Sequence, residues 1–285
     1  MKAVIFNADD FGAQQETNVA IIRGHVEGVL TSASLMVNES AAGEAVELAR
    51  QHSSLAVGLH LTLSNGIAAL THEASPHIVD SRRRFRESPA LAGIACFFHP
   101  FARREVRKEV RAQFEKFLAT GLPCDHVNGH QHLHLHPVIW DAMTELCEEY
   151  GVKRVRIPYE EFLPKNRKRL AGRRMEWLFF RTLRRRSLRT LEGKGFTVPD
   201  RVYGHLETGR ITEEYLLELL GRLEGATNEI YSHPGTPHSA PSPGDSAAVD
   251  AELAALISSR IRERISELTL DKTSYSRIGQ TLKAS

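Results

Sequence analysis

The sequence lacks the features that mark membrane-spanning, secreted and repeat proteins. No apolar run approaches the ~20 residues that a membrane-spanning helix needs, and the apolar stretch near the N-terminus is too short for a signal peptide. Only three cysteines are present, Cys96, Cys124 and Cys147, and their odd number and wide spacing predict reduced thiols instead of a disulfide framework. No internal repeat or low-complexity tract occurs. We therefore expect a cytoplasmic globular protein.

The chain as a whole has almost no excess of charge of either sign, but one segment is strongly basic. The 37 Lys and Arg residues nearly balance the 35 Asp and Glu residues, which gives a formal net charge of +2. Residues 165–194 nevertheless hold twelve Lys or Arg residues against two Glu, so this segment carries +10 and the rest of the chain −8. A basic segment on an otherwise acidic protein indicates a local function of that segment and not a general affinity for polyanions. We expect no nucleic-acid partner, because no recognised binding module accompanies it.

Short apolar strands alternate with amphipathic helices along the chain, a pattern typical of α/β proteins with a parallel sheet. Strands are expected at residues 3–7, 33–38, 55–60, 126–130, 152–158 and 229–232. Helices are expected at residues 105–119, at 138–150 with Gly151 at the end, and at 253–265, while 66–102 and 233–245 are expected to be loops. No linker divides the sequence. We expect a single domain over residues 1–285, built as a distorted TIM-like (β/α) barrel with inserted helices and loops.

Polar side chains recur where the predicted strands end. They are Asp9, Asp10, Asn38, His60, His130, Arg156 and His233. The carboxyl ends of parallel strands converge on one face of a barrel, where active sites form. Packing alone does not explain polar groups at the ends of six strands, so this set is the strongest indication of a functional site.

The adjacent carboxylates of Asp9 and Asp10 indicate a cation site. Two adjacent carboxylates repel each other unless a positive charge lies beside them. A divalent metal ion supplies that charge, since one aspartate can bind it while the other stays free as a base. The alternative is that one of them caps the helix that follows.

The segment 125–136 is rich in histidine, and the histidines at 130, 132, 134 and 136 alternate. In a strand, alternation directs all four to one face. One or two of them would bind an ion, and the others, such as His132, would line or support the site. Asp125 is expected to orient a ligand imidazole from behind.

A catalytic metal site needs three protein ligands and an open position. Asp10, His60 and His130 supply such a set, although a lone histidine such as His60 is more often a hydrogen-bonded structural residue. A mixed Asp/His/His set suits one divalent ion, Zn²⁺ or Mg²⁺, with Mn²⁺ or Co²⁺ also acceptable.

Three further residues are candidates for contact with a substrate or for proton transfer. Arg156 is either a clamp for a carbonyl or carboxylate group or a member of a surface ion pair, and Asn38 is a weaker binding candidate. His233 precedes a Pro-Gly pair, so it belongs either to the site or to a turn.

At these residues the sequence resembles the YdjC/ChbG-type carbohydrate deacetylases, and most closely their hopanoid-biosynthesis (HpnK) branch. The matching segments are NADDFG (7–12), TSASLMVN (31–38), AVGLHL (56–61), HVNGHQHLH (126–134) and YSHPG (231–235). The resemblance implies a barrel enzyme that removes the N-acetyl group of an amino sugar with Mg²⁺ or Zn²⁺.

The same resemblance implies a role for individual residues. Asp10, His60 and His130 match the family's metal ligands, Asp9 matches its catalytic aspartate, and His233 matches the histidine of its HPG motif. This chain departs from the commoner DSHHHVH form, because Asn128 replaces an Asp and Gln131 replaces a His. The hydrogen bonding behind the ligands must therefore differ.

The basic segment 165–194 also carries an apolar helical stripe, formed by Met175, Leu178, Phe179, Leu183 and Leu188. Such a helix suits an anionic membrane surface, and it equally suits packing on the barrel. We expect the substrate to be an N-acetylglucosaminyl hopanoid lipid at the inner face of the cytoplasmic membrane. The alternatives are soluble chitooligosaccharides as substrates, or a non-catalytic metal-binding adaptor, and a homodimer is left open.

Overall fold

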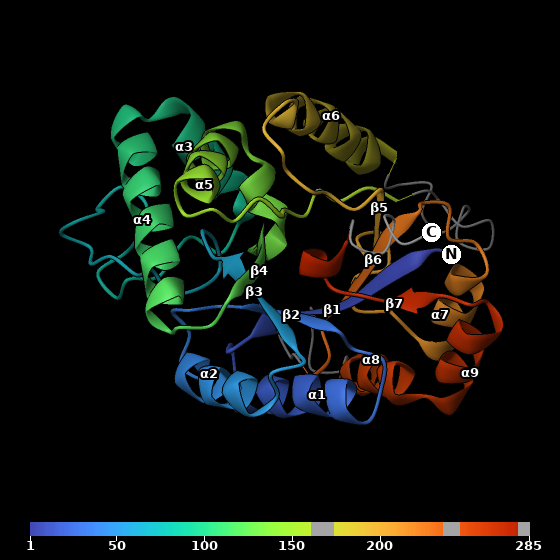
Figure 1. Cartoon of the computed structure of the whole chain (residues 1–285). Coiled ribbons are helices and arrows are strands. Elements are labelled where there is room, and N and C mark those ends of the chain that lie inside the picture. Colours follow the sequence, from blue (N-terminus) through green and yellow to red (C-terminus); the bar gives the residue numbers. More distant parts are fainter. Residues whose placement is uncertain (161–173, 236–245, 279–285) are drawn as a thin grey trace.

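The computed structural model describes residues 1–160, 174–235 and 246–278 (Figure 1). The strands are β1 (Ala3–Phe11), β2 (Ser32–Leu35), β3 (Ala56–Leu61), β4 (Cys124–Gly129), β5 (Arg201–Tyr203), β6 (Thr227–Ser232) and β7 (Asp271–Lys272). The helices are α1 (Gln15–Val26), α2 (Ala42–Gln51), α3 (Pro89–Phe98), α4 (Pro100–Ala119), α5 (Pro137–Glu149), α6 (Arg174–Leu191), α7 (Glu213–Leu220), α8 (Ser246–Ile257) and α9 (Ser259–Glu267). Two 3₁₀ segments, η1 (His130–Leu135) and η5 (Tyr275–Arg277), complete the described elements.

The strands form one curled parallel sheet in the order β4-β3-β2-β1-β6-β5, and β7 pairs with the start of β1. Its two edges approach each other through residues 154–159. Val155 bridges Val127 of β4, and Tyr159 bridges Val202 of β5. The structure has no regular strand at 152–158, where one was expected. Isolated bridges from this segment to β4 and β5 instead close the ring between the two edges of the sheet. The predicted distorted barrel is confirmed.

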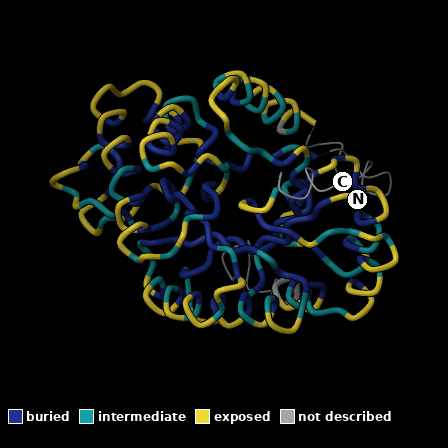
Figure 2. The backbone as a smooth tube through the Cα atoms, viewed as in Figure 1, coloured by how far each residue is buried: buried dark blue, intermediate teal, exposed yellow. Residues whose placement is uncertain are grey.

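Helices cover the outside of the sheet, with α1, α2 and α8 on one side and α3 to α6 on the other (Figure 1). The strands β1, β2 and β6 are buried along their whole length, and β3, β4 and β5 are buried beyond their first residue (Figure 2). Each strand therefore has one face toward the helices and one toward the barrel interior. Phe6 and Ala8 belong to the large hydrophobic cluster, while the alternate residues Asn7 and Asp9 take part in polar contacts in the interior.

The interior is polar at most of these alternate positions. Its buried side chains include Asn7, Asp9, Ser34, His60, His126, Asn128 and Glu229. A barrel interior in an ordinary TIM fold is filled by branched apolar side chains. The exchange of apolar for hydrogen-bonded polar groups is the structural basis of the site described below.

Two predicted elements are wrong. The alternating histidines are not in a strand, because β4 ends at Gly129 and Gln131 and His132 adopt left-handed backbone angles, with φ of 52° and 55°, inside η1. The expected long helix at 253–265 is two helices, since Ser258 interrupts it and caps α9 by accepting from the backbone N–H of Ile261.

Other parts of the sequence behave as expected or add to the expectation. Helices α4 and α5 agree with the predicted periodicity, and Gly151 has the positive φ that its position after α5 requires. The expected loop 66–102 contains α3, and β5 and β7 were not predicted. Residues 161–173, which include the start of the basic segment, and residues 236–245 of the expected loop 233–245 lie outside the described residues. Among the described residues, no helix is both long and apolar enough to cross a membrane.

Candidate active site

The end of β1 carries both aspartates into the same site. In a regular strand, neighbouring side chains point to opposite faces, so only Asp9 would face the barrel interior. Asp10 instead adopts a left-handed conformation with φ of 65°, where the pairing of β1 with β2 shifts register. A non-glycine residue held there costs on the order of 1–3 kcal/mol. This local departure brings the second carboxylate to the mouth of the barrel.

The structure brings Asp10, His60 and His130 together. Each is buried and offers one ligand atom, and these atoms lie within 4.8 Å of one another. Asp10 Oδ1 is 3.3 Å from His60 Nε2 and 3.0 Å from His130 Nδ1. This is the one group of its kind among the described residues, and its members come from the carboxyl ends of β1, β3 and β4, as the sequence predicts.

The protonation pattern around His60 fits a metal ligand. Its Nδ1–H donates to Asn128 Oδ1 over 2.6 Å, which leaves a lone pair on Nε2 facing Asp10. Asn128 Nδ2 in turn donates to Ser34 Oγ over 2.8 Å. A neutral amide therefore holds this ring where the resembling family has an aspartate.

Electrostatics around Asp10 also favour a cation. Burial opposes its charged form, but His130 and His60 hold the pKa of Asp10 well below its usual range. Burial likewise opposes a charged His130, yet the facing Asp10 raises the pKa of that imidazole. An ionised carboxylate between two imidazoles needs a positive partner, which is either a proton or a metal ion. The residues present thus fit a divalent ion with nitrogen and oxygen ligands.

Asp9 is held by a second set of contacts. Arg156 donates to both of its oxygens, from Nη1 to Oδ2 over 2.6 Å and from Nη2 to Oδ1 over 3.0 Å, and Asn7 Nδ2 donates to Oδ1 over 2.9 Å. Burial raises the pKa of Asp9, but the charge and hydrogen bonds of Arg156 together with the nearby His60 and His233 outweigh burial and keep this pKa far below the usual range. His233 Nε2 lies 3.9 Å from Asp9 Oδ2. The site therefore combines an ionised carboxylate and an imidazole beside the candidate metal group.

Arg156 is not placed as a substrate clamp, nor is it a surface residue. Its side chain is 0% exposed, its guanidinium spans Asp9 and Glu229, and it lies 4.5 Å from the centre of the Tyr231 ring. Each of its three guanidinium nitrogens already donates to a carboxylate. The expected substrate contact is corrected to a positioning role, in which Arg156 aligns Asp9.

The other two binding candidates lie farther from the carboxylates. Asn38 Oδ1 accepts a hydrogen bond from Lys116 Nζ over 2.8 Å, and Asn38 lies three residues beyond the end of β2. His132 Nε2 is 2.8 Å from the hydroxyl of Tyr231. Burial keeps the pKa of His132 well below its usual value, with the neighbouring His205 acting in the same direction, so this ring is neutral. No described contact joins either residue to Asp9, Asp10, His60 or His130.

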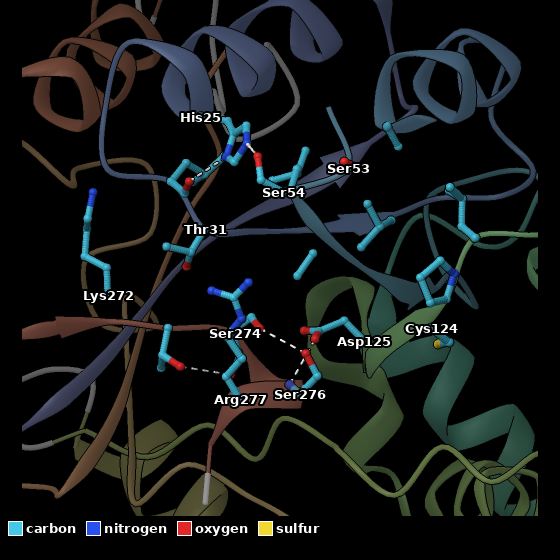
Figure 3. A pocket seen from close by; sticks show the side chains of 18 of the residues that line it. His25, Thr31, Ser53, Ser54, Cys124, Asp125, Lys272, Ser274, Ser276 and Arg277 are labelled. Atoms are coloured by element: carbon cyan, nitrogen blue, oxygen red, sulfur yellow. Dashed lines mark hydrogen bonds between the residues drawn. The ribbon is translucent and has the colours of Figure 1, made fainter. Parts of the chain in front are cut away.

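Asp125 does not contact a ligand imidazole, which corrects that prediction. It lies at the start of β4, at the opposite end of the barrel, and accepts from the backbone N–H groups of Tyr275 and Ser276 over 3.2 Å and 3.0 Å. Figure 3 shows it in a pocket of about 470 Å³ at that end, beside Ser274, Ser276 and Arg277. The reason is the direction of β4, in which Asp125 is the second residue and His130 follows the last.

A buried hydrogen-bonded chain nevertheless connects Asp125 to His60. His126 Nδ1 contacts Asp125 over 3.2 Å, and His126 Nε2 contacts Ser34 Oγ over 3.0 Å. Ser34 accepts from Asn128, which holds His60. The chain crosses the barrel from its amino end to the site.

Sequence reasoning missed most members of this network, including Asn7, Ser34, His126, Glu229 and Tyr231. A signal was present, because polar residues recur at alternate positions in the second half of β1 and in β2 and β4, which otherwise read as buried. Polar residues inside fully buried strands are expected to be hydrogen-bonded to one another, and their period of two assigns them to the barrel interior.

Comparison with known proteins places this geometry in context. The family model described as "YdjC-like protein" matches residues 3–267. A carbohydrate deacetylase of Brevibacillus brevis is 30% identical over 281 residues, which span 97% of this chain and 99% of the relative. A carbohydrate deacetylase of Geobacillus stearothermophilus is 37% identical over 148 residues, which span 51% of this chain and 56% of the relative.

Among solved structures, a crystal structure of an Enterococcus faecalis protein named for cellobiose-phosphate cleavage superposes with a TM-score of 0.74. The two chains are 26% identical, and the match covers 97% of this chain and 98% of the other. The similarity in sequence and in fold thus extends over nearly the whole chain.

Proposed function

Because the chain belongs to the YdjC-like protein family, we propose that it hydrolyses the N-acetyl group of an amino sugar with a divalent ion held by Asp10, His60 and His130. The observation that carries the proposal is the buried Asp/His/His group beside an arginine-held aspartate. Relatives named carbohydrate deacetylases support the substrate class. The metal is Mg²⁺ or Zn²⁺, and the ligand set also accepts Mn²⁺ or Co²⁺.

The two groups beside the metal ligands divide the proton transfers. Asp9 accepts the proton of the attacking water, and Arg156 and Asn7 keep its carboxylate ionised and aligned for that task. His233, whose Nε2 lies 3.9 Å from Asp9 Oδ2, donates a proton to the departing amine. A bound divalent ion would polarise the acetyl carbonyl and lower the pKa of water at the site.

The finer proposal concerns the substrate, which we propose to be an N-acetylglucosaminyl hopanoid lipid at the inner face of the cytoplasmic membrane. Helix α6 supports this substrate, because one half of its apolar stripe is exposed and the other half packs on the protein. Met175, Leu178 and Phe179 at its first two turns are 85%, 54% and 60% exposed, while Leu183 and Leu188 pack against the core. The first half of the helix is thus available to a lipid surface, and the second half anchors it on the barrel.

The test is acetate release from lipid-linked and soluble N-acetylglucosamine substrates. We expect Asp9→Asn to lower turnover by about 10²–10⁴-fold, the range typical of a lost general base, with the bound metal content unchanged. Asn keeps the shape of the side chain, so metal content serves as the control for folding. An Asp9→Asn protein with wild-type turnover would overturn the base assignment.

Other outcomes distinguish the alternatives. Turnover restricted to soluble chitooligosaccharides would remove the lipid substrate and leave the deacetylase. Tight metal binding by four protein ligands, with no turnover on any acetylated sugar, would favour the non-catalytic adaptor.

A further inference from the structure

Helix α3 exposes its apolar residues and buries its small ones. Leu91, Ile94 and Phe98 are 57%, 56% and 76% exposed, and they recur at the spacing of one helical face. The opposite face, with Ala92 and Cys96, packs on the protein. A helix on the surface of a globular protein normally has the reverse arrangement, with polar residues outward.

The ridge continues into the next helix. Phe97 in the last turn of α3 and Phe101 in the first turn of α4 are also exposed. A contiguous set of five large apolar side chains on a surface marks an interaction site, since scattered single ones are the norm for soluble proteins.

Basic residues surround this ridge. Residues 82–108 hold eight Lys or Arg against two Glu. Exposed arginines stand on both sides of the ridge, with Arg84 and Arg86 before α3 and Arg103 and Arg104 after it. Apolar side chains ringed by arginines are complementary to an anionic bilayer, whose headgroups take the charge while its acyl region takes the rings. A second copy of this chain on the same face would instead oppose arginine to arginine.

The ridge of α3 and the exposed half of α6 both adjoin the segment that carries His130. On one side, the ring of Phe97 lies 6.0 Å from that of His136, directly after η1. On the other side, the ring of Phe180 in α6 lies 5.8 Å from that of His132 within η1. Figure 1 shows α3 and α6 along the same edge of the molecule. Both apolar ridges therefore flank the candidate active site.

We propose that the α3–α4 elbow is a second membrane contact, which docks with α6 on an anionic lipid surface and holds η1 between the two. The proposal rests on the proposed function only for its purpose, which is access to a lipid-linked sugar. Docking itself requires no turnover. It follows that substitutions on α3 reduce vesicle binding and activity on membrane-embedded substrate, and leave activity on a soluble N-acetylated sugar unchanged.

The experiment measures flotation of the full chain with phosphatidylcholine vesicles, with and without phosphatidylglycerol. The variant replaces Leu91, Ile94 and Phe98 by Gln, which is uncharged and a good helix former. We expect its partition onto anionic vesicles to fall by about ten-fold or more, since the three large apolar side chains that would be buried in the bilayer are removed. The matched control replaces the exposed Val19 and Val26 of α1 by Gln, and we expect it to float like the wild type.

Three results would overturn the proposal. The first is equal flotation of the α3 variant and the wild type, and the second is a similar loss in the α1 control. The third is a wild-type dimer that the α3 substitutions convert to a monomer without loss of vesicle binding, which light scattering would detect. Circular dichroism confirms that each variant is folded. Loss of turnover on every substrate with normal flotation would contradict the proposed function alone.

Discussion

Arg156 is the residue on which two buried carboxylates depend. It pairs with both Asp9 and Glu229, and all three side chains are at most 2% exposed. Neither carboxylate has another cationic partner from Lys or Arg among the described contacts. A buried charge that loses its partner costs more than a surface charge does, because water cannot replace the partner.

We predict that Arg156→Gln lowers the free energy of unfolding by about 3–5 kcal/mol, the range for breaking a buried ion pair by removing one partner. Urea denaturation in the presence of a chelator measures this value. The matched control is Arg154→Gln in the same segment, whose guanidinium donates to the carbonyls of Cys124 and Asp125. Its expected cost is about 1–3 kcal/mol, and an Arg156 variant no worse than this control would contradict the account.

We also predict that Arg156→Gln changes how the free energy of unfolding depends on pH. In the wild type the pKa of Asp9 is lower in the folded state than in the unfolded state. Its ionised form therefore contributes stability above the unfolded pKa of about 4, and this contribution is lost as the pH falls through the folded pKa. Without Arg156 the burial of Asp9 raises its pKa instead. We expect acidification below pH ~5 to destabilise the variant less than the wild type, and parallel pH curves would contradict this.

At the residue scale, the sequence predicts the members of the candidate metal group but not the backbone geometry that brings them together. Asp10, His60 and His130 were identified from their places after strands and from a family resemblance. The left-handed turn at Asp10 could not be foreseen, since aspartate prefers the ordinary region and only tertiary contacts hold it there. The role of Arg156 was also missed, because a single arginine at a strand end fits a substrate as well as a buried carboxylate.

At the element scale, β3 and β4 are held at a close approach by a glycine. A Cβ atom added at Gly58 would overlap the imidazole ring of His126 on the neighbouring strand. That ring contacts Ser34, which accepts from the Asn128 amide that holds His60. The absence of a side chain at Gly58 is thus what admits the polar chain into the barrel.

We predict that Gly58→Ala lowers the free energy of unfolding by about 1–3 kcal/mol, the usual cost of overpacking, and weakens metal binding because the support of His60 shifts. Thermal melting and metal titration measure the two effects. The control is Gly43→Ala in α2, where an added Cβ meets nothing within 4 Å. There we expect a gain of about 0.5–1 kcal/mol, so a stable Gly58→Ala protein with normal metal affinity would argue against the packing described.

Long periodic elements were the most predictable ones. The helices α4 and α5 follow from hydrophobic spacing, whereas the alternation of His with Leu133 and Leu135 in η1 imitates a strand although the segment is a 3₁₀ helix. The bridges at 154–159 lack a regular ladder, so no local pattern marks how the ring closes. Helix α3 was missed because its apolar residues face outward, which removes the usual amphipathic signal.

At the scale of the whole molecule, the proposed metal site would couple metal binding to folding. The three candidate ligand atoms converge only in the folded chain, so an ion bound there would stabilise the native state. At a free concentration of 100 times the dissociation constant, the gain is about 2.7 kcal/mol. We predict that Zn²⁺ raises the midpoint of thermal unfolding of the wild type and does not raise that of Asp10→Ala, as scanning calorimetry would show. Equal shifts in both proteins would place the bound ion elsewhere.

The global architecture was predictable because strand and helix signals alternate along nearly the whole chain, and parallel strands separated by helices have few alternatives. The arrangement of the surface was not. Charge and periodicity predict the apolar stripe of α6, but the exposed apolar residues of α3 become visible only when the exposed side of each helix is known.

The most direct measurement of the central claim is a crystal structure of the chain grown with Zn²⁺ or Mn²⁺, with the ion located by its anomalous scattering. The account predicts a single strong peak about 2.0–2.2 Å from Asp10 Oδ1, His60 Nε2 and His130 Nδ1, with at least one coordination position open toward Asp9 and His233. A peak bound by other side chains, or no peak among these three at saturating ion, would contradict it.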